Sequence, residues 1–137
     1  MGKLGFNRRL PLLESNVMKI LYAIVSAAIL ALGVVHMATT FRLSSSVVFK
    51  VWFFGAGMAI ALSGALNLLN RKYGLAALGL RVVCIVTNAL MICLAGIAGR
   101  VTGASVWEQV IMLTVLTSAL VLSPLRSASI NPQEPGR

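Results

Sequence analysis

The residues of this chain that could do chemistry are a few polar side chains that interrupt long apolar runs. Ionisable and amide groups at membrane depth are costly, and they usually face the interior of a helix bundle or a water-filled cavity. We therefore expect them to line a site that binds a ligand. The candidate ligand-binding residues are His36, Lys50, Asn67, Arg81, Asn88, Glu108 and Gln109. Their types and spacing assign no catalytic and no metal-binding residue, because a single histidine without a nearby cysteine or carboxylate cluster gives no metal-ligand pattern.

Some of these candidates form a layer toward the predicted outer side, and His36 and Glu108 are its main members. His36 lies about one turn inside the end of its apolar run, and Glu108 lies at a similar depth from the same side. Lys50 and Gln109 fall in the same layer. A histidine and a carboxylate at one level could relay protons, act as acid and base, orient a ligand or hold two helices together. Glu108 alone could instead complement the dipole at the start of its helix.

The remaining candidates lie toward the predicted inner side or near the middle. Asn67 comes near the end of the second apolar run, and Arg81 lies about two turns into the third. The long Arg81 side chain could reach the headgroups. It could instead face inward and bond to Asn67 and to backbone carbonyls. An inward Arg81 would suit an anionic headgroup, a carboxylate or a quinone oxygen. Asn88 lies near the middle of the third run, where its amide needs partners, so we expect it to bridge helices.

The elements that must position these side chains are four apolar runs, each long enough to cross about 30 Å of hydrocarbon. They cover residues 18–40, 47–69, 75–98 and 105–125. The chain is 58% hydrophobic and only 11% charged, whereas soluble domains carry about 25% charged residues. Short connections favour the packing of consecutive helices as antiparallel neighbours. The sequence therefore predicts an all-α fold, an integral membrane antiparallel four-helix bundle.

The apolar runs also divide the chain into parts. We expect residues 1–17 to form a cytoplasmic N-terminal segment and residues 18–125 to form the transmembrane domain. The proline- and glycine-containing residues 126–137 read as a disordered cytoplasmic tail. Either Met1 or Met18 could be the native start.

The net charge of +9 arises from twelve basic residues and only three acidic ones. In a soluble protein that excess would suggest nucleic acid, but basic residues also concentrate at the cytoplasmic ends of transmembrane helices. Basic residues on one side of the runs outnumber those on the other by eight or nine to three. We therefore expect no nucleic-acid partner. The counts predict a multi-pass protein of a bacterial inner (plasma) membrane, with the N-terminus and the C-terminus in the cytoplasm.

Small residues in the second run indicate where helices could pack closely, as membrane helices do. They form two rows at four-residue spacing: Gly55, Ala59 and Ser63, and Gly57, Ala61 and Ala65. Two such rows predict a helix with neighbours on two sides. One neighbour could be a second protomer, so a homodimer or a membrane-complex partner stays open.

Cysteine and aromatic residues receive simpler interpretations. Cys84 and Cys93 lie on opposite faces of one predicted helix, so they cannot form a disulfide with each other. We expect both to be small core residues. Aromatic residues near the predicted helix ends are expected to act as interfacial anchors. These are Tyr22, Trp52, Tyr73 and Trp107.

Several segments of the first half are similar to a known group of proteins. The segments are Gly33-Val34-Val35-His36, Trp52-Phe53-Phe54-Gly55-Ala56-Gly57 and Gly64-Ala65-Leu66-Asn67-Leu68-Leu69. In these segments the chain resembles small four-helix membrane proteins of bacteria, broadly the DoxX-like group. Some DoxX-like members are linked to quinone-dependent redox enzymes, so the resemblance implies an accessory or quinone-proximal role. It assigns no catalytic residue here.

The leading functional hypothesis is a non-catalytic membrane protein that binds a small amphipathic ligand, lipid or quinone-like, or a membrane partner. Beyond a possible quinone or lipid, the sequence predicts no cofactor, and the lipid bilayer is its expected surrounding. A first alternative is an oligomeric small-molecule transporter or channel. A second is a membrane-embedded redox or lipid-modifying enzyme that uses His36 and Glu108 as acid and base.

Overall fold

The structure is a computed structural model that describes residues 9–128, with side chains described for residues 16–124. It contains the helices α1 (Arg9–Thr40), α2 (Val47–Tyr73), α3 (Leu78–Thr102) and α4 (Val106–Ala128), and no strand within the described residues. The all-α prediction is therefore confirmed. Helix α1 begins at Arg9, well inside the predicted N-terminal segment 1–17. The predicted tail 126–137 is helical as far as Ala128, and its remainder lies outside the described residues, as does the segment 1–8.

Each helix contains a segment that is long and apolar enough to cross a membrane. The segments are Asn16–Thr40, Val47–Tyr73, Leu78–Thr102 and Val106–Pro124, with mean hydropathies of 2.3, 1.7, 2.3 and 1.6. The shortest has 19 residues, which span about 28 Å at a rise of about 1.5 Å per residue. By length and composition, these helices indicate a multi-pass membrane protein.

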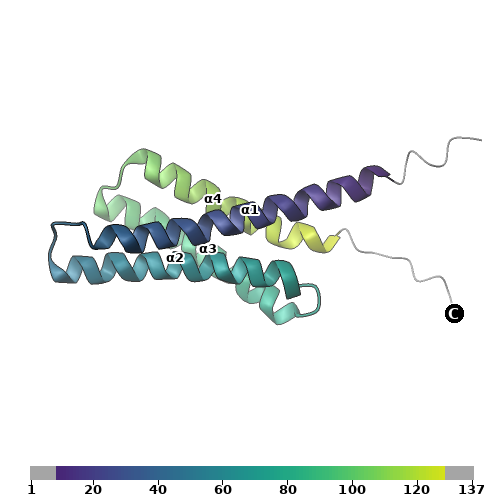
Figure 1. The fold of residues 1–137 in the computed structure, drawn as a ribbon, viewed down its shortest axis with the longest axis horizontal. Coiled ribbons are helices and arrows are strands. Elements are labelled where there is room, and N and C mark those ends of the chain that lie inside the picture. Colours follow the sequence, from purple (N-terminus) through teal and green to yellow (C-terminus); the bar gives the residue numbers. More distant parts are fainter. Residues whose placement is uncertain (1–8, 129–137) are drawn as a thin grey trace, which may run out of the picture.

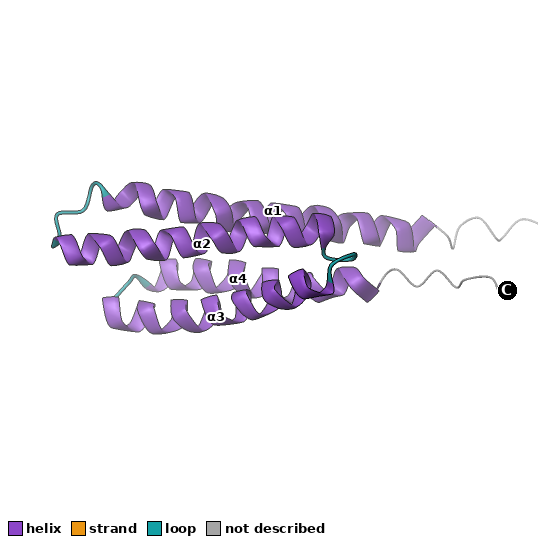
Figure 2. Cartoon of the chain, turned by 90° about the horizontal axis from the view of Figure 1, so that it is seen from below, coloured by secondary structure: helices purple, strands orange, loops and turns teal. Residues whose placement is uncertain are grey.

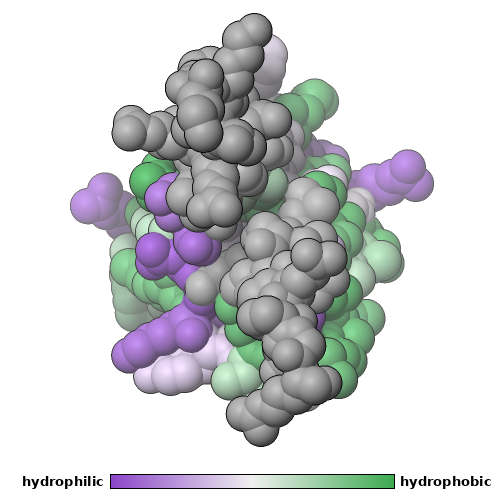
Figure 3. Space-filling model, turned by 90° about the vertical axis from the view of Figure 1, so that its right-hand side faces the viewer, coloured by the Kyte–Doolittle hydropathy of each residue, from purple (hydrophilic) through white to green (hydrophobic). Residues whose placement is uncertain are grey.

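Large apolar side chains cover the outside of the molecule. Ile24, Leu62, Leu90 and Val121 are all more than half exposed, and they come from four different helices. Apolar side chains surround the flanks in the view along the bundle, while hydrophilic ones gather at the end nearer the viewer (Figure 3). A water-soluble protein rarely exposes so large a contiguous apolar surface. Hydrocarbon is the solvent that this surface suits.

The helices lie side by side with their connections at alternate ends. The α1–α2 and α3–α4 loops lie at one end (Figure 1), and the α2–α3 loop lies at the other (Figure 2), together with the start of α1 and the end of α4. Contacts run in a ring from α1 to α2, α3, α4 and back to α1, with a weaker contact between α2 and α4. All four helices therefore surround one interior.

The contact between α1 and α2 is the most extensive in the bundle, and glycines make it close. A Cβ on Gly33 would collide with the backbone of Ala61, and a Cβ on Gly64 would collide with that of Leu30. A Cβ on Gly57 would lie 2.8 Å from the backbone nitrogen of Met37. The two backbones are thus in direct contact, as small residues allow in membrane helices. This confirms that the predicted row through Gly57 and Ala61 faces a neighbouring helix.

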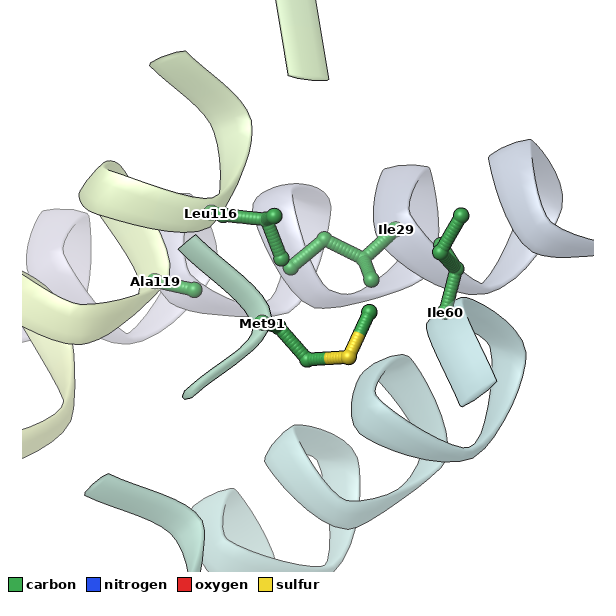
Figure 4. Packing of buried hydrophobic residues seen from close by; sticks show 5 residues of the cluster. All are labelled: Ile29, Ile60, Met91, Leu116 and Ala119. Atoms are coloured by element: carbon green, nitrogen blue, oxygen red, sulfur yellow. The ribbon is translucent and has the colours of Figure 1, made fainter. Parts of the chain in front are cut away.

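A small hydrophobic core fills the middle of the bundle. Its buried residues are Ile29, Ile60, Met91, Leu116 and Ala119 (Figure 4). They come from all four helices, and their side chains point toward one another across the interior. This core occupies the level next to a second, polar cluster, which lies nearer the end with the α2–α3 loop.

Candidate functional site

Eight polar or thiol side chains are buried together between the helices, none of them more than 4% exposed. We call this set the buried polar cluster. Its members are Tyr22 and Ser26 of α1, Ser63, Asn67 and Asn70 of α2, Cys84 and Asn88 of α3, and Ser123 of α4. Every helix contributes, so the cluster connects the whole bundle. Buried polar groups require hydrogen-bond partners, and the cluster supplies most of them internally.

The centre of the cluster is a reciprocal pair of amides. Asn67 Nδ2 donates to Asn88 Oδ1 at 2.9 Å, and Asn88 Nδ2 donates back to Asn67 Oδ1 at 2.9 Å. The Ser63 hydroxyl adds a bond to Asn88 Oδ1 at 3.1 Å, and Asn67 Nδ2 also donates to the Ser63 carbonyl at 2.8 Å. These bonds join α2 to α3. The prediction that Asn88 bridges helices is confirmed.

Tyr22 links the amide pair to α1. Its hydroxyl donates to Asn67 Oδ1 at 2.8 Å and accepts from Asn70 Nδ2 at 3.0 Å. The Cys84 thiol also donates to Asn67 Oδ1, with 3.2 Å between Sγ and Oδ1. Together with Asn88, these groups give Asn67 Oδ1 three donors. Asn67 is therefore the residue on which the network converges.

Asn70 extends the network to α4 and leaves one polar atom without a partner. Its Nδ2 donates to Ser123 Oγ at 2.9 Å as well as to Tyr22. Its Oδ1 is the buried side-chain oxygen that has no hydrogen-bond partner among the described residues. This oxygen lies against Gly74, where an added Cβ would collide with it. The site thus tolerates no side chain at Gly74 without a shift of the asparagine.

The cluster consists of amides, hydroxyls and a thiol, and these groups make it suited to holding helices together. It contains no carboxylate or imidazole, which are the usual general acids and bases. Among the described residues no group of three or more histidine, cysteine or acidic side chains could hold a metal ion. Interhelical hydrogen bonds of this type contribute about 0.6 kcal/mol each on average within a membrane, and at most about 1.7 kcal/mol.

Arg81 closes the end of α2. Its Nη2 donates to the carbonyl of Gly74 at 2.9 Å, and the side chain is half-buried. A cation at a helix C-terminus is favoured by the helix dipole. Of the two kinds of partner considered from the sequence, Asn67 and backbone carbonyls, Arg81 bonds to a backbone carbonyl. Arg81 therefore lies at the same end of the bundle as Asn70 without joining its hydrogen bonds.

The polar contacts of His36 and Glu108, the main members of the outer layer, are local ones. The His36 ring stacks on Phe53, with 3.7 Å between ring centroids and 20° between ring planes. Glu108 Oε2 accepts from the Ser105 backbone N–H at 3.2 Å, and the Ser105 hydroxyl accepts from the Glu108 N–H at 3.3 Å. That reciprocal arrangement is a capping box. No hydrogen bond or ion pair joins His36 to Glu108, although both side chains are described.

Gln109 makes local hydrogen bonds, whereas the Lys50 side chain makes none among the described residues. Gln109 Nε2 donates to the carbonyls of Gly99 at 3.2 Å and Ala104 at 2.9 Å, which fixes the turn between α3 and α4. Lys50 is half-buried, and its ammonium makes no hydrogen bond among the described residues. Within residues 16–124, the only side-chain hydrogen bonds between two predicted site residues are those that join Asn67 and Asn88.

Several cluster residues were interpreted differently from the sequence. Tyr22 was expected at the membrane interface, but it is 1% exposed and bonded inside the bundle. Cys84 is buried among polar groups, whereas Cys93 is exposed and not a core residue. The signal that could have found the cluster is helical spacing. Polar residues recur at four-residue intervals in the pairs Tyr22 with Ser26, Ser63 with Asn67, and Cys84 with Asn88.

An open groove of about 550 Å³ runs between α1 and α4. We call it the α1–α4 groove. Its walls are mostly aliphatic, with a strip of hydroxyl groups from α4. The lining residues are Leu21, Val25, Leu113, Thr114, Thr117, Ser118, Val121 and Leu122. The groove opens on the apolar outer surface of the bundle, and its residues Leu21 and Leu122 are the sequence neighbours of Tyr22 and Ser123. It is therefore accessible from outside the bundle, whereas the buried polar cluster is not.

No protein-family model matches the chain, and no curated protein or solved structure matches it either. The resemblance to the DoxX-like group stays a prediction from the sequence. The function is therefore argued from the cluster, the groove and the composition of the helices.

Proposed function

We propose that this chain is an integral membrane protein, an antiparallel four-helix bundle of the bacterial inner membrane with both termini in the cytoplasm. We further propose that it binds a small amphipathic ligand, lipid or quinone-like, and does not catalyse a reaction. The membrane location is supported by the four long apolar helices and by the exposed apolar side chains on each of them. The orientation is supported by the excess of basic residues on one side.

The observation that carries the ligand proposal is the α1–α4 groove. Its volume of about 550 Å³ falls within the usual range of small-molecule sites. Aliphatic side chains such as Leu21 and Val121 suit an acyl or isoprenoid chain, and the Thr117 hydroxyl offers a polar contact on one wall. A groove open to lipid also lets a ligand enter sideways from the bilayer. A quinone-like occupant would agree with the role that the DoxX-like resemblance implies.

The interior of the bundle weighs against a transport path within one copy, and the contacts of His36 and Glu108 weigh against the acid–base alternative. Its hydrogen bonds and the adjoining hydrophobic core occupy the interior, so a transport path through one copy would have to break them. The acid–base alternative requires His36 and Glu108 to act together. The Glu108 carboxylate instead caps its own helix, and His36 stacks on Phe53.

The proposal is tested by filling the groove. Val121→Phe places a ring in the α1–α4 groove, whereas Val86→Phe places one on an equally exposed face of α3. Both variants are purified gently from membranes, and the lipids and quinones that copurify are extracted and measured. We expect Val121→Phe to lose the bound species and Val86→Phe to retain it. Equal retention by the two variants would exclude the groove as the site.

A further inference from the structure

A second concavity, of about 420 Å³, lies between α1 and α2 near the end with the α2–α3 loop. It is lined by Lys19 of α1 and by Leu68, Arg71 and Lys72 of α2. We call it the basic pocket. Hydrophilic side chains gather at this end of the molecule, beyond the apolar flanks (Figure 3). The pocket combines three cations with one aliphatic side chain.

The cations do not all have a local explanation. Arg71 and Lys72 lie in the last turn of α2, where the helix dipole favours positive charge. Lys72 also places its ammonium 5.0 Å from the centroid of the Tyr73 ring. Lys19 belongs to another helix, yet it lines the same concavity and is half-buried there, as Arg71 is. The three cations line one concavity, so an anion bound there would relieve their mutual repulsion.

The position of the pocket matches the headgroup level of a bilayer. Lys19 lies near the start of the apolar segment Asn16–Thr40, and Arg71 lies near the end of Val47–Tyr73. Beside them, Ile20 and Leu69 are exposed apolar side chains on the same helices. Basic side chains next to exposed apolar side chains, at the end of an apolar segment, suit a ligand that has both an anionic group and a hydrocarbon chain. A free anion would need only the charge.

We propose that the basic pocket binds the phosphate of an anionic phospholipid headgroup. Arg71 contributes a planar guanidinium that can bind two phosphate oxygens, and Lys19 contributes a point charge from the facing helix. Leu68 contacts the first carbons of the lipid. Basic pockets between transmembrane helices bind phospholipid headgroups in this way. The inference rests on the proposed membrane location but not on the α1–α4 groove.

The test uses the full chain, delipidated in a neutral detergent, with lipid binding measured by native mass spectrometry. The probes are phosphatidylglycerol and phosphatidylcholine with identical acyl chains. We expect phosphatidylglycerol to bind more tightly, and Lys19→Gln/Arg71→Gln to weaken that binding about 30-fold, since two surface cations are lost. The charge-preserving variant Lys19→Arg/Arg71→Lys is expected to retain the preference. The control Arg42→Gln/Arg100→Gln removes two exposed cations from the opposite end and should change nothing.

Three outcomes overturn the proposal, each for a separate reason. Equal phosphatidylglycerol binding by the wild type and Lys19→Gln/Arg71→Gln excludes the basic pocket. If inorganic phosphate displaces phosphatidylglycerol and binds with the same affinity as the lipid, the pocket is a site for a free anion. Loss of binding in Arg42→Gln/Arg100→Gln as well shows a nonspecific charge effect. If Val121→Phe loses its copurified ligand but keeps the preference for phosphatidylglycerol, the α1–α4 groove and the basic pocket are independent sites. A negative result at one of them then does not contradict the proposal for the other.

Discussion

Asn67→Leu tests whether the buried polar cluster holds the helices together. The substitution keeps the approximate size of the side chain and removes four interhelical hydrogen bonds, with Tyr22, Cys84 and Asn88. At about 0.6 kcal/mol for each such bond in a membrane, the loss amounts to about 2–3 kcal/mol. Two donors that Asn67 satisfied, the Tyr22 O–H and the Asn88 Nδ2–H, lose that acceptor, and a buried donor without a partner costs about 1–3 kcal/mol. Tyr22 Oη still accepts from Asn70, and Asn88 Oδ1 still accepts from Ser63. We therefore expect the free energy of unfolding to fall by at least about 2 kcal/mol.

The measurement is reversible unfolding in mixed micelles, followed by far-ultraviolet circular dichroism. A double-mutant cycle with Asn88→Leu isolates the amide pair. Once Asn67 is lost, Asn88 has already lost its reciprocal partner, so the second substitution should cost less than it does alone. We expect a coupling free energy of about 1 kcal/mol, since two bonds are shared.

Additive effects would refute this reasoning. If the two single substitutions sum to the double within about 0.5 kcal/mol, the amides do not act on each other. The matched control is Leu62→Ala, which truncates an exposed apolar side chain on the same helix and removes no hydrogen bond. A similar loss of stability in that variant would show that α2 is sensitive to any change.

Three other substitutions or labels follow from the packing. Gly33→Ala should lower the free energy of unfolding by about 1–3 kcal/mol, because the added methyl overpacks the α1–α2 contact. Glu108→Ala should cost about 0.3–1 kcal/mol, because it removes one bond of the capping box and the negative charge from the first turn of α4. In a double-mutant cycle, the losses of unfolding free energy in Glu108→Ala and His36→Ala should be additive. A membrane-permeant maleimide should label Cys93 in the folded protein and reach Cys84 only after unfolding, as mass spectrometry of the labelled chain would report.

Each of these has a control or a contrary result. Gly55→Ala meets no atom within 4 Å of the added methyl and should leave stability nearly unchanged, unlike Gly33→Ala. Strong coupling between Glu108 and His36 would show that the two side chains act together after all. Rapid labelling of Cys84 at the rate of Cys93 would show that the buried polar cluster is open to the membrane.

The position of polar residues along the helices was easier to predict from the sequence than the contacts that their side chains make. Asn88 could be predicted to bridge helices because an amide at membrane depth needs hydrogen bonds, but the sequence did not identify Asn67 as its partner. The same reasoning could not tell that His36 stacks on Phe53 or that Glu108 caps its own helix, because depth along a helix does not determine the side-chain contacts. It also treated Tyr22 as an interfacial anchor, which its place near a helix end favours. The bonds from Tyr22 to Asn67 and Asn70 depend on how α1 rotates against α2.

Helix boundaries differ from the apolar runs for a physical reason. Hydropathy marks where lipid contact ends, whereas a helix continues as long as its backbone bonds do. Helix α1 therefore begins at Arg9, although the apolar run predicted from the sequence begins at residue 18. The close α1–α2 contact was foreseeable from the small-residue row in α2. Its partner Gly33 in α1 was visible in the sequence, but only the structure shows that it faces Ala61.

The central claim is that this bundle carries an amphipathic ligand in the membrane. The measurement that tests it most directly is a native mass spectrum of the wild-type protein, released gently from its own membrane. We expect a bound species with the mass of a lipid or quinone that accompanies the chain in fixed stoichiometry and is identified after extraction. A chain that appears only without any bound mass would contradict the claim and leave the buried polar cluster as a purely structural feature.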